Sequence, residues 1–454
     1  MNVDRRPEEG LDPAVWQRHE MRMALAARDI AAVFRLLQRV GVSQRRIASL
    51  TGQSQSEISE ILGGRQVMAY DVLARIADGL GLPRGHMGLA YDPNTAALVE
   101  SAPAEAAAND ENEDPRRMLA RVAQVTVGAV ALDPESWWQP FERSTAPVPT
   151  HVGLADVLRL ENITDEFRAL DHQYGGGACR DAVVAQAQSA QQMLRATIAD
   201  DVGPRLHTAL ADLHLLAGWT SFDVGLYAPA RRHFARALEQ ARYAEEPSLV
   251  AKVLNCMGRL HLHQGLTVEA LRLFQLGQIA AQESSCPLAV SLVTANEAWA
   301  YSLLGDVAQA LAAVTRAKAE FAKGDPWHDP PPWIRFFGSA DLQSLIAFTY
   351  ASLPDPTPQQ RAIAIEGFYV STALRELSMT RSRAFDMTML AFCLFEAAHI
   401  DEAIKIGYEA VELAEQVRSL RVIDRFTPLR ASAARHVARS DARDLVERVD
   451  KLRG

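Results

Sequence analysis

The sequence predicts an all-α protein, in which a small N-terminal unit of five helices precedes a long solenoid of helical repeats. Apolar residues recur at helical spacing through residues 13–92, which indicates short amphipathic helices. Gly225, Gly265 and Gly305 stand forty residues apart, and a fixed period of this length is typical of a solenoid. From residue 154 onward the apolar pattern is helical throughout.

Length, charge and cysteine content narrow the class of protein. A chain of 454 residues is expected to form two or three domains. The net charge is −9, but residues 1–92 hold 12 Arg against 11 acidic residues, which favours local contact with nucleic acid over bulk phosphate binding. Cys179, Cys256, Cys286 and Cys393 form no CxxC pair, which is typical of reduced core residues in a cytoplasmic protein. No signal peptide or apolar run of about 18 residues is present, so no membrane span is expected.

The N-terminal helices are expected at three places outside the central motif. Pro13 suits the first turn of an amphipathic helix over residues 13–28. Asp29 can cap the next helix, which ends before Gly41, and residues 70–80 give a further helix that stops at Gly81. The domain is expected to span residues 13–92.

Residues 43–65 carry the pattern of two helices that cross closely. Ala48 is small enough for the crossing, Gly52 suits a turn with positive φ, and Ile58 points back into the core. Together with Gln44, this spacing resembles the lambda repressor and Cro family, also called the xenobiotic-response-element (XRE) family of helix-turn-helix regulators. The resemblance covers residues 29–90.

The resemblance implies that the second helix of the motif enters the major groove of double-stranded DNA. Amide and hydroxyl groups there can bond base edges, whereas arginines can contact phosphates. The candidate DNA-binding residues are Gln44, Arg45, Arg46, Ser54, Gln55, Ser56, Ser59 and Arg65. The resemblance also implies that Gln44 touches a phosphate and braces Gln55. The alternative is a solvated surface helix, on which Glu and Lys would be more typical.

Residues 93–115 are acidic and poor in large apolar side chains, which is typical of a flexible linker. A connecting segment follows over residues 116–153. Its cluster of Trp137, Trp138 and Phe141 is expected to pack a loop onto a domain, with a partner surface as the alternative.

Residues 154–454 are expected to form the repeat domain. Ala230, Ala270 and Ala310 keep the forty-residue period, and each unit indicates two helices joined at a glycine. The pattern resembles the tetratricopeptide repeat (TPR), with longer helices. A fourth unit carries Ala391, Ala398, Ala403 and Ala410. Residues 154–200 and 337–377 are interpreted as degenerate units, and residues 425–452 as a capping helix.

The inner wall of the solenoid is the candidate groove for a ligand or a partner. Superposing the units puts Trp219, Arg259, Trp299 and Phe392 at one shared position. Nearby in the same register lie Asp212, Phe222, Asp223, Lys252, Asn255 and His263. Aromatic rings around a guanidinium can hold a planar or anionic ligand. The alternative is that the Trp side chains only fill space and that Arg259 pairs with Asp223.

Weaker patterns favour structural roles. Gly175, Gly176 and Gly177 lack the Lys of a P-loop, so a turn is expected. The Pro-rich insert at 325–337 either covers one end of the groove or simply connects two units. No metal, cofactor or catalytic pattern stands out, so no enzyme is expected.

These patterns predict a cytoplasmic transcription regulator that binds an operator as a homodimer and senses a small molecule, peptide or protein through its repeats. Regulators with this pairing of modules are familiar in actinomycetes, and related ones sense peptides as dimers. The alternative is a repeat-based interaction scaffold whose helix-turn-helix unit serves docking or dimerisation.

Overall fold

The computed structural model describes residues 15–16, 18–26, 28–67, 70–82, 87, 150–324 and 330–453. The prediction of an all-α protein is confirmed within these ranges, apart from one parallel pair of two-residue strands, β1 (His151–Val152) and β2 (Thr197–Ile198). The predicted linker, the connecting segment and the cluster of Trp137, Trp138 and Phe141 lie outside the described residues. Among the described residues, every helix is too short or too polar to cross a membrane.

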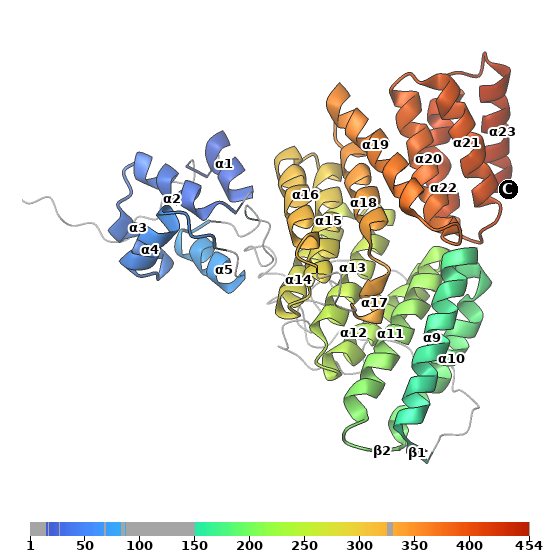
Figure 1. The fold of residues 1–454 in the computed structure, drawn as a ribbon, viewed down its shortest axis with the longest axis horizontal. Coiled ribbons are helices and arrows are strands. Elements are labelled where there is room, and N and C mark those ends of the chain that lie inside the picture. Colours follow the sequence, from blue (N-terminus) through green and yellow to red (C-terminus); the bar gives the residue numbers. More distant parts are fainter. Residues whose placement is uncertain are drawn as a thin grey trace, which may run out of the picture.

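The N-terminal body contains five helices around its own apolar core (Figure 1). They are α1 (His19–Ala26), α2 (Ile30–Arg39), α3 (Gln44–Thr51), α4 (Gln55–Leu62) and α5 (Tyr70–Gly79). Asp29 caps α2 as predicted, since its carboxylate accepts a hydrogen bond from the backbone of Ala32 at 2.9 Å. The expected helix over residues 13–28 is wrong at its start: Val15 and Trp16 form a 3-10 turn with both side chains buried, and α1 begins only at His19.

The repeat body is built from antiparallel helix pairs. The first pair, α9 (Leu154–Tyr174) and α10 (Arg180–Gln191), precedes the regular units. The forty-residue repeats are α11 (Gly203–Asp223) with α12 (Tyr227–Tyr243), α13 (Pro247–His263) with α14 (Thr267–Glu283), and α15 (Pro287–Leu303) with α16 (Val307–Phe321). After the short α17 (Pro332–Arg335) come α18 (Ser339–Ala351) with α19 (Pro358–Leu374), α20 (Thr380–Glu396) with α21 (Ile400–Ala414), and α22 (Leu420–Ala434) with α23 (Ser440–Arg453).

The predicted period reflects one repeated packing solution. Gly225, Gly265 and Gly305 all adopt φ near +80°, at the same turn between paired helices, where a side chain would be strained. A Cβ on Gly258 would lie 2.3 Å from the ring of Phe274, and Gly218 meets Phe234 in the same way. The helices of a pair can therefore approach closely enough to bury a whole aromatic ring between them.

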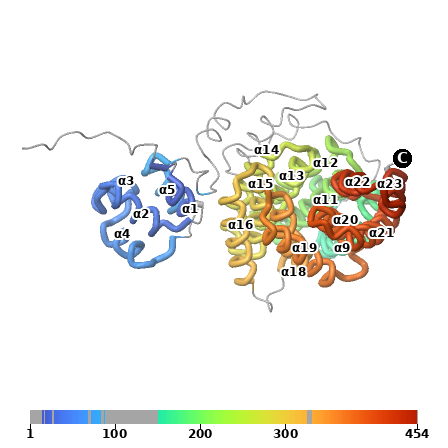
Figure 2. Tube along the Cα trace, turned by 90° about the horizontal axis from the view of Figure 1, so that it is seen from above, coloured from blue at the N-terminus to red at the C-terminus, as the bar shows by residue number. Residues whose placement is uncertain are grey.

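The solenoid curls until its last helices meet its first ones (Figure 2). Arg381 on α20 donates two hydrogen bonds to Asp171 on α9, at 2.5 and 2.7 Å, across 210 residues of sequence. Arg421 on α22 reaches Asp223 at the end of α11. The predicted capping helix at 425–452 is therefore wrong in two respects: the region forms two helices, and α22 lines the interior of the ring.

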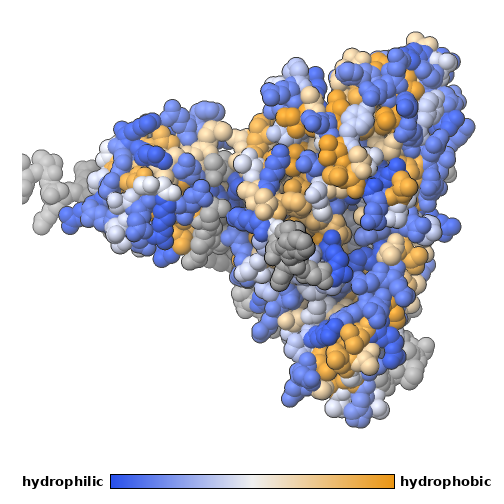
Figure 3. All heavy atoms as spheres, in the orientation of Figure 1, coloured by the Kyte–Doolittle hydropathy of each residue, from blue (hydrophilic) through white to orange (hydrophobic). Residues whose placement is uncertain are grey.

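Apolar side chains also reach the outside of the ring. Figure 3 shows such side chains gathered over α18 and α19, between polar areas. Leu374 on α19 and Leu377 just after it are exposed, as are Tyr369 and Val370.

Candidate nucleic-acid interface and solenoid pocket

The helix-turn-helix is fixed by caps and by one glycine. Ser43 caps α3, and Gly52 ends it with φ 64°, as predicted. Thr51 is buried, but its hydroxyl donates to the carbonyl of Ile47 at 2.8 Å, so this unusual polar residue is satisfied. Gly79 on α5 meets α3 so closely that a Cβ would overlap the carbonyl of Leu50. The position of α3 against α5 is therefore set by backbone packing.

Helix α4 begins with a capping box. The hydroxyl of Ser54 accepts from the backbone of Glu57, and the Glu57 carboxylate accepts in return from the backbone N–H and the hydroxyl of Ser54, at 2.7 and 2.9 Å. These hydrogen bonds, chiefly the one from the Ser54 backbone, lower the pKa of Glu57. The other acidic residue of α4, Glu60, accepts from Arg65 at 2.6 Å.

Uncharged polar side chains are exposed where α4 begins. Gln55, Ser56 and Ser59 are all exposed, and Gln55 and Ser59 share one face because they are four residues apart. Arg45 and Arg46 are exposed on the preceding helix. Amide and hydroxyl groups are thus available to bases, with guanidinium groups nearby for phosphates.

Two of the predicted DNA-contact residues have partners within the domain, and two others lack the contact expected between them. The hydroxyl of Ser54 takes part in the helix cap with Glu57, and Arg65 donates a hydrogen bond to Glu60. Gln44 and Gln55 are both exposed, and within the described chain no hydrogen bond joins them. The S-x-x-E spacing of the capping box was the sequence signal for the role of Ser54.

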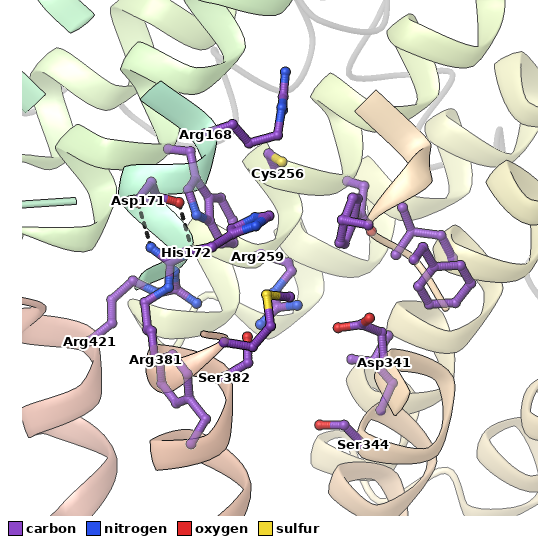
Figure 4. Close-up of a pocket in the computed structure, with 18 of the residues that line it drawn as sticks. Arg168, Asp171, His172, Cys256, Arg259, Asp341, Ser344, Arg381, Ser382 and Arg421 are labelled. Atoms are coloured by element: carbon purple, nitrogen blue, oxygen red, sulfur yellow. Dashed lines mark hydrogen bonds and ion pairs between the residues drawn. The ribbon is translucent and has the colours of Figure 1, made fainter. Parts of the chain in front are cut away.

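A pocket lies inside the ring of the solenoid (Figure 4). Side chains converge on it from both ends of the repeat body. The basic and acidic residues that line it are Arg168, Asp171, His172, Lys252, Arg259, Asp341, Arg375, Arg381, Asp386, Arg421 and Arg425.

Four of these cations have carboxylate partners. Arg168 donates to Asp212 at 2.6 Å, and Arg375 bonds to both Asp386 and Asp341, at 2.7 and 3.0 Å. Arg381 and Arg421 share the fully buried Asp223, whose second oxygen also accepts from the backbone of Gly176 at 2.8 Å. These pairs hold the wall together.

Three further cations on the wall form no salt bridge within the described residues: Lys252, Arg259 and Arg425. Arg259 lies 5.7 Å from the ring centroids of both Trp219 and Trp299. Burial lowers the pKa of Arg259 to about 10, and repulsion from Arg425 acts in the same direction. Burial also lowers the pKa of Lys252, whose ammonium sits 3.7 Å above the ring of Phe336.

The histidine in the pocket adds no charge at neutral pH. Burial, followed by repulsion from Arg381, lowers the pKa of His172 to about 3. The imidazole is therefore a neutral hydrogen-bonding group in a strongly cationic pocket.

The structure brings together only part of the predicted groove. Trp219, Lys252, Asn255 and Arg259 line the pocket, and Trp299 lies against Arg259. Asp212, Phe222 and Asp223 lie behind the wall, and His263 bonds to Asp424 at 3.1 Å. The shared position assigned to Phe392 is wrong for the pocket, because the pocket meets only the first two turns of α20, with Arg381, Ser382 and Phe385, and Phe392 lies two turns beyond Phe385 on the same helix. The pairing of Arg259 with Asp223, considered as the alternative, does not occur: Asp223 bonds to Arg381 and Arg421.

Sequence reasoning missed the arginines of α20 and α22. Arg421 lies 4.4 Å from the rings of Trp219 and Phe222, and Arg425 lies 5.3 Å from Trp299. Their spacing of four residues on one helix was a signal of a common face. The neighbours of this face of α22 are set by closure of the ring, which no local sequence pattern shows.

The weaker sequence patterns are structural. The predicted turn is formed by Gly175, Gly176 and Gly177. It packs so closely that a Cβ on Gly175 would meet the backbone of Arg418, and one on Gly176 would meet the backbone of α11. The Pro-rich insert contributes Phe336 and Phe337 to the pocket wall, and Trp333 donates to Ser248 at 3.0 Å. Across the described ranges, no group of three His, Cys, Asp or Glu side chains is arranged to hold a metal ion.

The N-terminal body also touches the repeats. Helix α1 packs near α16, and Arg22 lies 3.9 Å from Asp306 at the start of α16. The pKa of the buried Glu297 on α15 is raised by burial to about 7 and is lowered in part by Arg28, which lies between α1 and α2. Helix α15 thus carries Trp299 toward the pocket and Glu297 toward the N-terminal body.

Comparison with known proteins assigns the N-terminal body. Residues 29–87 match a family described as helix-turn-helix domains. This match covers α2 to α5 and supports a helix-turn-helix DNA-binding domain. No curated protein matches the chain.

Proposed function

We propose that this protein is a transcription regulator that binds double-stranded DNA sequence-selectively through α4 and responds to a ligand held inside its repeat domain. The single observation that carries the DNA-binding part is the exposed opening of α4. Gln55, Ser56 and Ser59 face outward there, while both acidic residues of the helix are engaged by Ser54 and Arg65.

This arrangement fits base reading better than simple solvation. A Gln side chain can bond adenine through two atoms at once, and Ser can bond several base edges. The Glu57 carboxylate keeps its negative charge, but the capping box holds it against the Ser54 backbone, so that it does not extend toward the bases. Arg45 and Arg46 supply positive charge beside the helix for phosphate contacts that position it.

The proposed sensing part rests on the closed ring. Salt bridges between its two ends, such as Arg381 with Asp171, surround a pocket lined by cations and aromatic rings. A ligand that favours the closed ring shifts the DNA-competent population by its difference in affinity for the two arrangements, typically about 1–3 kcal/mol. Helix α15 and the contact of Arg22 with Asp306 offer a direct route to the N-terminal body.

We further propose a homodimer, because one helix-turn-helix buries little DNA surface and such domains commonly bind paired half-sites. The repeat body most readily carries the contact, since Leu374 and Leu377 are exposed beside other apolar side chains of α19.

Selection of binding sites from random duplexes by the purified full-length protein tests the DNA-binding proposal. The expected result is one enriched motif, with two related half-sites about one helical turn apart. Recovery of duplexes without any shared motif, at the affinity of non-specific binding, contradicts the proposal and favours the scaffold in which the helix-turn-helix serves docking.

A further inference from the structure

We propose that the pocket inside the solenoid binds a small organic anion in which at least two negative charges are attached to a planar aromatic ring. The inference rests on the proposed function in one respect only, namely that this pocket is where a ligand binds. It adds the chemical class of that ligand.

The charge argument starts from the pairing pattern of the wall. Arg168, Arg375, Arg381 and Arg421 are each matched by carboxylates at 2.5 to 3.2 Å. Lys252, Arg259 and Arg425 line the same space and form no salt bridge in the part of the chain that the structure describes. Asp424, the neighbour of Arg425 in sequence, bonds to His263 instead.

Three cations that share one enclosed space repel one another, and burial disfavours their charge. Removing charged groups from water costs several kcal/mol per ion unless a counter-charge is present. A fold that needed these residues only for packing would be served as well by apolar side chains of similar volume. The arrangement is therefore explained by an anion that arrives from outside the chain.

The aromatic argument comes from the rings beside the same cations. Arg259 lies 5.7 Å from Trp219 and from Trp299, and Arg425 lies 5.0 Å from the ring of Phe348. Phe336 lies under Lys252, and Phe385 lines the wall from α20. Flat apolar surfaces alternate with charged groups, so a ring on the ligand can stack while its anionic groups reach the cations.

One more polar group is available for orientation. The side-chain oxygen of Asn255 is buried and has no hydrogen-bond partner among the described residues. It lies on α13 between Lys252 and Arg259, and it lines the pocket. A hydroxyl or amino group on the ligand would satisfy it, since buried polar groups are normally hydrogen-bonded.

The enclosure argues for a small molecule and against a macromolecule. The pocket lies inside a ring that is closed by buried contacts between α9, α11, α20 and α22. A folded partner would have to open the ring to reach Arg259.

Isothermal titration of the full-length protein, in the absence of DNA, tests the inference with phenyl phosphate, 1-naphthyl phosphate and benzene-1,2-dicarboxylate. Inorganic phosphate supplies the charge without the ring, and phenol supplies the ring without the charge. We expect at least one aromatic dianion to bind roughly tenfold or more tightly than either control, because stacking and charge-assisted bonds are both made. Equal affinity of phosphate or phenol, or no binding by any of the three anions, overturns the proposal.

Substitutions locate the binding. Arg259→Gln and Arg425→Gln should each weaken the binding of the best aromatic anion by roughly tenfold or more, because each removes one charged hydrogen-bond donor. Arg242→Gln removes the same charge from the exposed face of α12 and should leave affinity unchanged. Unchanged affinity in both pocket variants overturns the assignment, and thermal melting shows whether each variant is folded.

Melting also separates a ligand role from a packing role. Because Arg259 has no carboxylate partner in the described chain, Arg259→Gln should not lower Tm. If the role of Arg259 were instead to hold the two Trp rings in place, Arg259→Gln should melt at a lower temperature than the parent protein. A loss of Tm in Arg259→Gln that equals the loss in Arg381→Gln, together with unchanged anion affinity, contradicts the inference. Binding of an aromatic dianion without any effect on DNA binding leaves the inference standing and refutes the sensing part of the proposed function.

Discussion

Asp223→Asn removes the charge on which closure of the solenoid depends. Asp223 is fully buried and accepts hydrogen bonds from the backbone of Gly176 at 2.8 Å, from Ser419 at 2.9 Å and from Arg421 at 3.2 Å. Arg381 lies 3.5 Å from it as well. The amide keeps the shape of the side chain but leaves the buried arginines short of a counter-charge and turns an N–H₂ group toward donors.

Breaking a buried ion pair by removing one partner typically costs about 3–5 kcal/mol, so a loss of this size in the free energy of unfolding is expected for Asp223→Asn. Urea unfolding measures the loss, and hydrogen exchange should show faster exchange in both α9 and α22, because the substitution releases the two ends from each other. The reduced protection at both ends distinguishes ring opening from local damage.

Asp450→Asn is the matched control. Its carboxylate accepts two hydrogen bonds from Arg430, but both side chains are substantially exposed. Exposed pairs contribute about 0–1 kcal/mol, so the control should shift the urea midpoint little. Equal shifts for the two variants, or exchange confined to α11 in Asp223→Asn, would refute the account of closure.

Three further predictions concern pH, signalling and assembly. Burial raises the pKa of Glu297 from 4.5 to about 7, so between these pH values the folded protein binds more protons than the unfolded chain. The free energy of unfolding should therefore fall by roughly 3 kcal/mol as the pH rises from 4.5 to 7. Glu297→Gln should remove this fall, and urea titrations at about pH 5 and about pH 8 measure it; a slope that persists in the variant would assign the effect to other groups. Arg259→Ala should abolish the response of a reporter on the native target promoter to inducing growth conditions. If the variant still responds, Trp219 and Trp299 serve only to fill space between helices. Light scattering at micromolar concentration should give about twice the chain mass of 49.8 kDa, and a monomer mass with one protomer per DNA site would exclude the dimer.

The helix-turn-helix could be predicted because its signals are local. Asp29 and Ser43 cap helices through residues three positions away, and Gly52 ends α3 through its own φ. The same locality explains what could be predicted in the repeats, where Gly258 and Phe274 recur at a fixed distance in sequence. The early start expected for α1 failed because Val15 and Trp16 pack into the core through a 3-10 turn, a tertiary preference that overrides helical periodicity.

The pocket could be predicted only in part. The register placed Trp219, Arg259 and Trp299 together, because the three units repeat one geometry. It could not place Arg421 or Arg425, which reach the pocket through closure of the ring by contacts such as Arg381 with Asp171. Phe392 failed for a related reason: ring closure brings only the first two turns of α20, with Arg381 and Phe385, to the pocket, and Phe392 lies two turns further along the helix. Contacts across some 200 residues leave no periodic trace in a sequence.

The central claim is that α4 reads bases, and one affinity ratio tests it most directly. The ratio compares binding of the selected motif with binding of a scrambled duplex, at one fixed salt concentration, for the parent protein, Gln55→Ala and the control Gln359→Ala. Gln359 is exposed on α19, far in sequence from α4. The account predicts that Gln55→Ala loses about 1–3 kcal/mol of discrimination while its affinity for the scrambled duplex is kept, and that Gln359→Ala changes neither. A ratio in Gln55→Ala equal to that of the parent protein would contradict the account.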